Sequence, residues 1–120
     1  MIVEGIRWKR VEGGSPDTLG DGELMRANVA GKTLCIVRNG GKLHALLDRC
    51  PHQGSSFIGG WCEGGDIICP LHRMGFNLAT GRNRGGGTDS AEVFPVEERP
   101  DGVYIGFAYT TFKIFGVELW

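Results

Sequence analysis

The sequence lacks a long hydrophobic run, a bias of charge and a helical period of useful length. No apolar stretch approaches the ~18 residues that a membrane-spanning helix needs. Residues 1–10 carry charge at Glu4, Arg7, Lys9 and Arg10, which is unlike a signal peptide. Lys and Arg number 13 against 14 Asp and Glu, so the net charge of −1 gives no overall attraction to nucleic acid or to membranes. These absences predict a soluble cytoplasmic protein that binds neither nucleic acid nor membranes.

Glycine, in contrast, is abundant. The 21 glycines in 120 residues are more than double the usual share, which is about 7%. Many tight turns favour short strands over long helices, and a hydrophobic content of 41% allows a small but real core. We find no repeat and no sign of a second domain, so we expect one domain over residues 1–120.

Short β-prone segments follow one another along the chain between turn signals. Pro95 interrupts one of them, which favours an edge position, and Asn39–Gly40 is a strong hairpin signal. The expected strands span residues 2–11, 23–29, 33–38, 42–47, 66–68, 76–78, 91–98 and 103–107, followed by a β-prone tail at 108–120 that is either a terminal strand or an oligomer contact. The pattern predicts an all-β protein.

Two short motifs stand at the centre of the chain. The first reads Cys-Pro-His at 50–52, and the second reads Cys-Pro-Leu-His at 69–72, with sixteen residues between them. Two thiolates and two imidazoles form a four-ligand set for a soft, sulfur-tolerant metal centre. Zinc fingers usually place two Cys on one arm and two His on the other, whereas here each arm has one of each. A structural zinc protein without a redox role remains an alternative from the residues alone.

The segment resembles the Rieske iron–sulfur motif. The resemblance implies one [2Fe–2S] cluster per chain, with Cys50 and Cys69 on the inner iron and His52 and His72 on the outer iron. It also implies an antiparallel β-sandwich or barrel base with an inserted cluster-binding subdomain at about 48–80, and the two His at the protein surface. The flanking sequences that resemble soluble Rieske ferredoxins are Arg-Cys-Pro-His-Gln-Gly at 49–54, Gly-Gly-Trp at 59–61 and Phe-Asn-Leu-Ala-Thr-Gly at 76–81.

Two cysteines fall outside the motif. Cys35 lies in an apolar run and is expected to be a buried structural thiol, whereas Cys62 follows a Trp in a glycine-flanked turn. A disulfide between them is disfavoured in a reducing compartment. Rieske proteins of quinol-oxidising complexes carry an extra Cys on each ligand loop. Here those places are held by Gln53 or Gly54 and by Leu71, so that disulfide-bearing, membrane-tethered subclass is not expected.

The resemblance implies a one-electron carrier between a flavin-dependent ferredoxin reductase and a terminal enzyme, most readily an oxygenase. We expect no catalytic residues. No His/His/carboxylate set for a mononuclear iron follows the Cys–His motifs, and the one remaining His, His44, precedes them. The alternative is a small Rieske subunit of a larger reductase, such as a nitrite reductase.

Several neighbours of the motif carry further expectations. High-potential members of the family have hydroxyl side chains shortly after the second His, where this chain has Met74 and Phe76. We therefore predict a potential at the low end of the Rieske range of about −150 to +300 mV. Arg49 and Arg73 are either solvated charges or part of a docking face for an acidic partner. Trp61 is expected to pack under the ligand loops.

Overall fold

The computed structural model describes residues 2–114 and 117–118, with side chains for residues 4–109. The strands are β1 (Ile2–Arg10), β2 (Leu24–Val29), β3 (Lys32–Asn39), β4 (Lys42–Leu47), β5 (Trp61–Glu63), β6 (Asp66–Ile68), β7 (Gly75–Asn77), β8 (Val93–Phe94), β9 (Val96–Arg99), β10 (Gly102–Ile114) and β11 (Val117–Glu118). A single 3-10 turn, η1 (Pro16–Thr18), is the remaining regular element of the described residues. The all-β expectation is confirmed. Within the described residues, no helix has the length and apolar character to cross a membrane.

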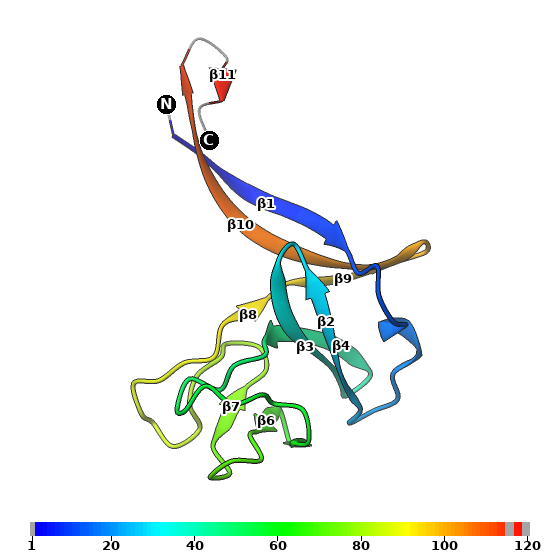
Figure 1. Cartoon of the computed structure of the whole chain (residues 1–120), viewed down its shortest axis with the longest axis vertical. Coiled ribbons are helices and arrows are strands. Elements are labelled where there is room, and N and C mark those ends of the chain that lie inside the picture. Colours follow the sequence, from blue (N-terminus) through cyan, green and yellow to red (C-terminus); the bar gives the residue numbers. More distant parts are fainter. Residues whose placement is uncertain (1, 115–116, 119–120) are drawn as a thin grey trace.

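The described residues form three antiparallel sheets (Figure 1). In the first, β10 pairs with β1, β9 and β11, and the register with β1 runs from Ile2 opposite Phe112 to Arg10 opposite Tyr104. The second sheet has the order β2-β3-β4-β8. The third, β5-β6-β7, is inserted between β4 and β8 and lies at the end of the molecule opposite β11. The tail extends β10 to Ile114, and the part of the tail at 115–116 and 119–120 lies outside the described residues.

The hairpin between β3 and β4 turns one residue later than expected. Asn39 pairs with Lys42, so the two turn residues are Gly40 and Gly41. Their φ angles are 63° and 81°, and a two-residue type I′ turn requires φ above zero at both positions. Two glycines meet that requirement without strain, whereas Asn39 would carry a side chain into it. Asn39 is therefore the last residue of the strand.

The segment expected to be one strand at 91–98 is in fact two strands of different sheets. β8 pairs with β4, and β9 pairs with β10. Pro95 lies between them, where it cannot donate a ladder hydrogen bond, and its carbonyl accepts from the Gly106 amide at 2.9 Å. The chain therefore crosses from the second sheet to the first at Pro95. The expected edge position is confirmed, because among the described strands β8 and β9 are each paired with one strand only and so lie at the edge of their sheets.

The central strand β3 is buried on both faces, which explains its unbroken apolar sequence. Leu34 and Ile36 face a core shared with the first sheet. Cys35 and Val37 alternate with them and face a second core, shared with the inserted sheet. This second core joins the third sheet to the base of the molecule and lies directly behind the two Cys–His motifs.

Candidate metal centre

The first ligand loop, residues 50–57, follows β4 and closes on its own cysteine. The Cys50 amide donates to the Ser55 carbonyl at 2.7 Å, and the Gly54 amide donates to the Cys50 carbonyl at 2.6 Å. Gly54 has φ of 76°, a left-handed conformation that glycine adopts without the steric cost of a Cβ. The loop is thus held in a tight turn with the Cys50 side chain inside it.

A buried carboxylate anchors this loop to the base. The Asp48 side chain is 1% exposed. It accepts hydrogen bonds from the Ser56 hydroxyl at 2.6 Å, the Phe57 amide at 2.8 Å and Nε of Arg26 at 2.8 Å. A buried charge requires such partners because its desolvation is otherwise costly. Asp48 therefore ties the end of the first ligand loop to β4 and, through Arg26, to β2.

The second ligand loop, residues 69–74, connects β6 to β7. The Cys69 amide donates to the Met74 carbonyl at 2.7 Å. His72 and Arg73 have φ of 62° and 56°, a left-handed conformation that costs a residue with a Cβ about 1–2 kcal/mol. Strain of this kind persists where the surrounding structure enforces it, and it is typical of functional sites. Here it lies on a predicted ligand.

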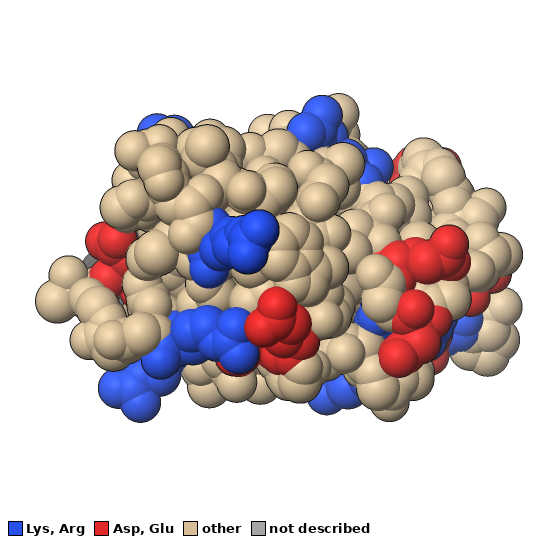
Figure 2. Space-filling view, turned by 90° about the horizontal axis from the view of Figure 1, so that it is seen from below, with Lys and Arg blue, Asp and Glu red and all other residues tan. Residues whose placement is uncertain are grey.

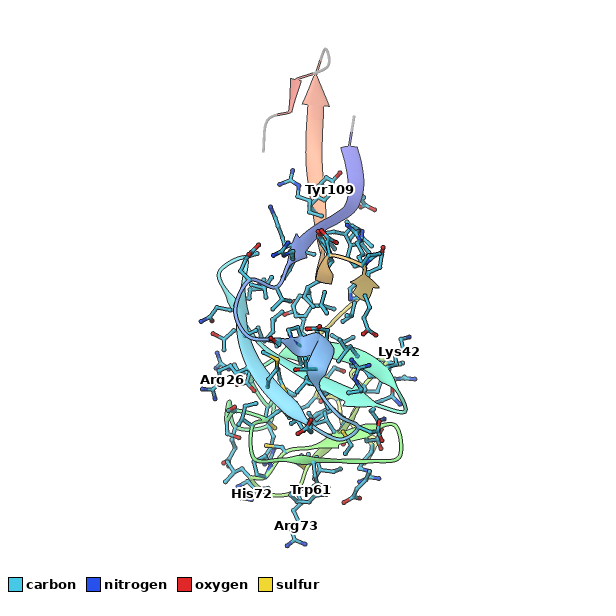
Figure 3. The ribbon with its side chains drawn as sticks, turned by 90° about the vertical axis from the view of Figure 1, so that its right-hand side faces the viewer. Arg26, Lys42, Trp61, His72, Arg73 and Tyr109 are labelled. Atoms are coloured by element: carbon cyan, nitrogen blue, oxygen red, sulfur yellow. The ribbon has the colours of Figure 1, made fainter. Side chains whose placement is uncertain are left out.

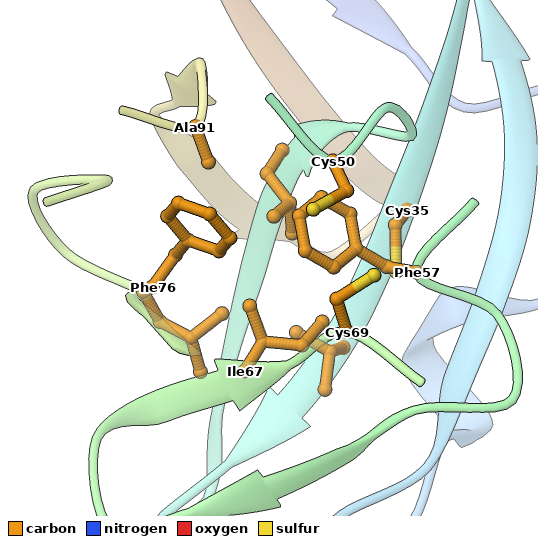
Figure 4. Close-up of a cluster of buried hydrophobic side chains, with 10 residues drawn as sticks. Cys35, Cys50, Phe57, Ile67, Cys69, Phe76 and Ala91 are labelled. Carbon is orange, nitrogen blue, oxygen red and sulfur yellow. The ribbon is translucent and has the colours of Figure 1, made fainter. Parts of the chain in front are cut away.

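The two cysteine side chains lie inside the protein. Cys50 is 1% exposed and Cys69 is fully buried, and both pack beside Phe57 in the second core (Figure 4). Burial raises the pKa of the Cys50 thiol, the backbone N–H of His52 lowers it, and the hydrogen-bonded Cys69 thiol raises it again. A thiol in this setting becomes a thiolate readily only when a cation replaces its proton.

The two histidine side chains lie outside, at the tip of the molecule. His52 and His72 are both exposed, and their rings meet edge to face with centroids 5.5 Å apart. Nε2 of His72 is 3.2 Å from Oε1 of Gln53, so a hydrogen bond across the two loops fixes the orientation of this ring. Figure 3 places His72 and Arg73 at the end of the molecule farthest from Tyr109. The imidazole pair therefore faces solvent.

These four residues fit a two-iron centre better than a single ion. Within the described residues, no three His, Cys, Asp or Glu side chains converge as the ligands of one metal ion do. The donors instead form a buried sulfur pair and an exposed nitrogen pair. A [2Fe–2S] cluster of mixed ligation takes two protein ligands on each iron, whereas structural zinc takes four at one point. When bound, such a cluster supplies a one-electron redox centre.

The remaining Cys and His residues stay outside the site. Cys35 and Cys62 are free thiols, so no disulfide joins them, and Cys35 is fully buried as expected. Burial raises the pKa of Cys35 far above its ordinary value. His44 is half-buried on β4, and burial, with Lys42 nearby, lowers its pKa. These positions agree with structural roles.

Trp61 does not pack under the ligand loops, contrary to expectation. It is 37% exposed, and its indole N–H donates to Glu63 at 2.6 Å. The alternation of β5 turns Trp61 outward and Cys62 toward the core. Phe57 and Phe76 fill the space instead, edge to face at 5.9 Å between centroids.

Two residues that support the site were not identified from the sequence: Ser55 in the first ligand loop and Asp48, which anchors that loop. Ser55 places its hydroxyl 3.3 Å from the sulfur of Cys69, and Asp48, directly after β4, accepts the Phe57 amide of the first ligand loop. Neither belongs to the Cys–His motif, and no spacing rule pairs a Ser on one loop with a Cys on the other. The one available signal was a lone Asp at the end of an apolar strand, directly before the motif.

The protein is all-β, and beside its inserted sheet a buried thiol pair lies behind exposed imidazoles. This arrangement is that of a cysteine–histidine metal centre. The protein-family model for the Rieske [2Fe-2S] domain matches residues 9–95 of this chain. The chain belongs to the Rieske [2Fe-2S] domain family, as its motifs predict.

Two curated relatives illustrate the range of the family. The ferredoxin component of the alkene monooxygenase system of Xanthobacter autotrophicus is 31% identical over 91 residues, 75% of each chain. Apoptosis-inducing factor 3 of Homo sapiens is 31% identical over 88 residues, 72% of this chain, but the match spans only 14% of that protein's length. The same domain therefore occurs both as a small protein and as a minor part of a large one.

Solved structures share the fold. A chain of the complex of reduced oxygenase and oxidized ferredoxin in carbazole 1,9a-dioxygenase matches with a TM-score of 0.70 and 31% identity, covering 82% of this chain and 91% of that one. A putative NADH-dependent nitrite reductase small subunit from Mycobacterium tuberculosis matches with a TM-score of 0.71 over 88% of this chain and 96% of that one. At 18% sequence identity, this similarity concerns the fold alone.

Proposed function

We propose that this protein is a one-electron carrier with one [2Fe–2S] cluster per chain. Cys50 and Cys69 hold the inner iron, and His52 and His72 hold the outer iron. The observation that carries the proposal is the arrangement of a fully buried thiol pair behind an exposed imidazole pair at one tip of the molecule. The chain itself contributes ligands, a rigid frame and a docking surface, and no catalytic residue.

The ligand set determines the range of the reduction potential. Two thiolates bring the oxidised centre to a formal charge of zero, since the imidazoles are neutral, whereas four thiolates would give a dianion. An electron is added more easily to a neutral centre, which is why mixed ligation gives potentials of about −150 to +300 mV. Exposed His52 and His72 provide the shortest route for the electron to the surface.

The partners follow from the relatives. Ferredoxin components of oxygenase systems are similar over most of this chain, and one similar structure is a complex between ferredoxin and oxygenase. We therefore propose that the carrier takes electrons from a flavin-dependent ferredoxin reductase and delivers them to a terminal oxygenase. The proposed location is the cytoplasm, where thiols remain reduced until a cluster is built on them.

The tip that carries the imidazoles has the character of a transient docking surface. Of the four large apolar side chains exposed among the described residues, three lie here: Ile58, Trp61 and Leu71. Arg49 and Arg73 are exposed beside them. Figure 2 looks onto this end and shows Lys and Arg near its centre and lower left, with Asp and Glu beside them below the centre and on the right. We propose that the exposed apolar side chains contact the partner and that the two arginines pair with acidic groups on it, because opposite charges accelerate and orient the encounter.

The proposal is tested first by the composition and spectrum of the purified protein. Two irons and two labile sulfides per chain, with a paramagnetic signal in the reduced state, are expected. A colourless protein with one zinc ion would overturn the proposal. Purified reductase and oxygenase should then reduce and reoxidise the protein at a rate that depends on ionic strength. Stable co-purification with a large reductase subunit would instead favour the alternative, a small subunit of a reductase.

A further inference from the structure

Ser55 contacts both cysteines of the site. Its carbonyl oxygen accepts the Cys50 amide at 2.7 Å, and its hydroxyl lies 3.3 Å from the sulfur of Cys69. The first contact lies within the first ligand loop and the second reaches across to the other loop. Ser55 is thus a side chain outside the Cys–His motif that joins the two halves of the site.

The protonation state of the ligand fixes the direction of this hydrogen bond. Between a thiol and a hydroxyl either group can donate, but a metal-bound Cys69 is a thiolate and can only accept. The Ser55 hydroxyl must then be the donor. A donor to a ligand sulfur stabilises the reduced state more than the oxidised state, because the added electron increases the negative charge on the sulfur.

The surrounding structure holds this hydroxyl in place. The adjacent Ser56 and Phe57 are bonded to the buried carboxylate of Asp48, so the backbone beyond Ser55 cannot swing away from the site without breaking two hydrogen bonds. The positions where the family's high-potential members have hydroxyls offer no substitute here. Met74 packs against the second core and Phe76 is fully buried.

Resting on the proposed function, we infer that Ser55 is a positioning residue that raises the reduction potential by donating a hydrogen bond to the sulfur of Cys69. The donor comes from the first ligand loop rather than from the segment after the second His. The low-potential expectation based on Met74 and Phe76 is unchanged, but the potential lies above the value that the site would have without this hydroxyl.

The test is a redox titration of cluster-loaded wild type and Ser55→Ala. The substitution should leave the iron and sulfide content intact and reduce the equilibrium constant for one-electron reduction about tenfold, which lowers the midpoint by about 59 mV. Ser15→Ala is the control. It removes an exposed serine hydroxyl at η1 that makes no side-chain cap hydrogen bond and lies outside both ligand loops, and it should move the midpoint by less than a third of that amount.

The outcomes distinguish a failure of the inference about Ser55 from a failure of the proposed function. A fully loaded Ser55→Ala protein with an unchanged midpoint, or equal shifts in both variants, overturns the inference and leaves the electron-carrier proposal standing. A wild-type preparation without a [2Fe–2S] cluster overturns the proposed function itself. If Ser55→Ala does not retain its cluster, Ser55→Thr and Ser55→Val decide, since they share a shape and differ by the hydroxyl. The Val protein must then have the lower midpoint, and equal midpoints refute the role of Ser55.

Discussion

Replacement of Asp48, which anchors the end of the first ligand loop, by Ala should strongly destabilise the protein. A hydrogen bond to a charged group contributes about 1.5–3 kcal/mol, and a donor left unsatisfied in the interior adds to its loss. Two of the three bonds, from Ser56 and Phe57, are made by a carboxylate that is 1% exposed. The third donor, Arg26, is 52% exposed, so water screens its contribution to at most about 1 kcal/mol. Two interior bonds of about 1.5–3 kcal/mol each, with at most about 1 kcal/mol from Arg26, give an expected cost of about 3–7 kcal/mol.

That cost should be measurable without abolishing the fold. At about 0.05–0.15 kcal/mol per residue, a chain of 120 residues has a total stability of about 6–18 kcal/mol. Urea unfolding of cluster-loaded Asp48→Ala, followed by far-ultraviolet circular dichroism and by the visible absorbance of the cluster, gives the change in the unfolding midpoint. The cluster signal should disappear at a lower urea concentration than in wild type, because the first ligand loop is released.

Matched variants separate the buried carboxylate from its partners. Ser56→Ala removes a hydroxyl that donates to Asp48 and accepts from Arg26 and from the Ile58 amide. Arg26→Gln removes the screened ion pair with Asp48 and the bond from Arg26 to Ser56. The expected order of destabilisation is Asp48→Ala, then Ser56→Ala, then Arg26→Gln. An unfolding midpoint for Asp48→Ala equal to that of wild type, or an Arg26→Gln variant as unstable as Asp48→Ala, would show that the carboxylate does not anchor the loop.

Four further predictions follow from the site and its surroundings. Cys69→Ala should abolish the visible absorption of the cluster, whereas Cys35→Ala should keep it at full iron content, because Cys35 lies in the core but outside the ligand set; equal loss in both would contradict the assignment. The potential of the wild-type protein should lie at the low end of the Rieske range, and a midpoint well above about +150 mV in a redox titration would refute that expectation. Burial lowers the pKa of His44 below its ordinary 6.5, so the unfolded chain binds a proton first on acidification. The resulting contribution to the unfolding free energy is complete above pH 6.5 and is lost as the pH falls toward the folded-state pKa; His44→Gln should weaken this acid dependence in urea unfolding. Arg73→Glu should slow electron transfer to an acidic partner and reduce its dependence on ionic strength in stopped-flow measurements, whereas Lys9→Glu on β1, with the same change of charge, should leave the rate near wild type.

The strands up to β4 were well predicted by the sequence, because they follow from apolar segments and glycine turns. The four ligand candidates, which stay a prediction, follow from the chemistry of thiolate and imidazole and from two short motifs. These signals lie within a few residues of one another. Boundaries moved where a glycine pair suited a turn better than its neighbour, as at Gly40–Gly41.

Contacts between distant segments were not predictable in the same way. Pairing of β1 with β10 joins strands about a hundred residues apart, and nothing in either strand specifies the other. Pro95 was read as an interruption of one strand, but it marks the crossing between two sheets. Trp61 was expected to pack under the ligand loops, but the alternation of β5 points it to solvent.

The sequence by itself determined which atoms are available to bind a metal, because ligand chemistry depends only on residue type and short spacing. Only the tertiary structure showed that Ser55 reaches the sulfur of Cys69 on the other ligand loop, and that Asp48, directly after β4, holds the end of the first ligand loop. Burial and contacts across loops depend on how the inserted sheet packs against β3 and β4, and that packing is a property of the whole chain rather than of any one segment.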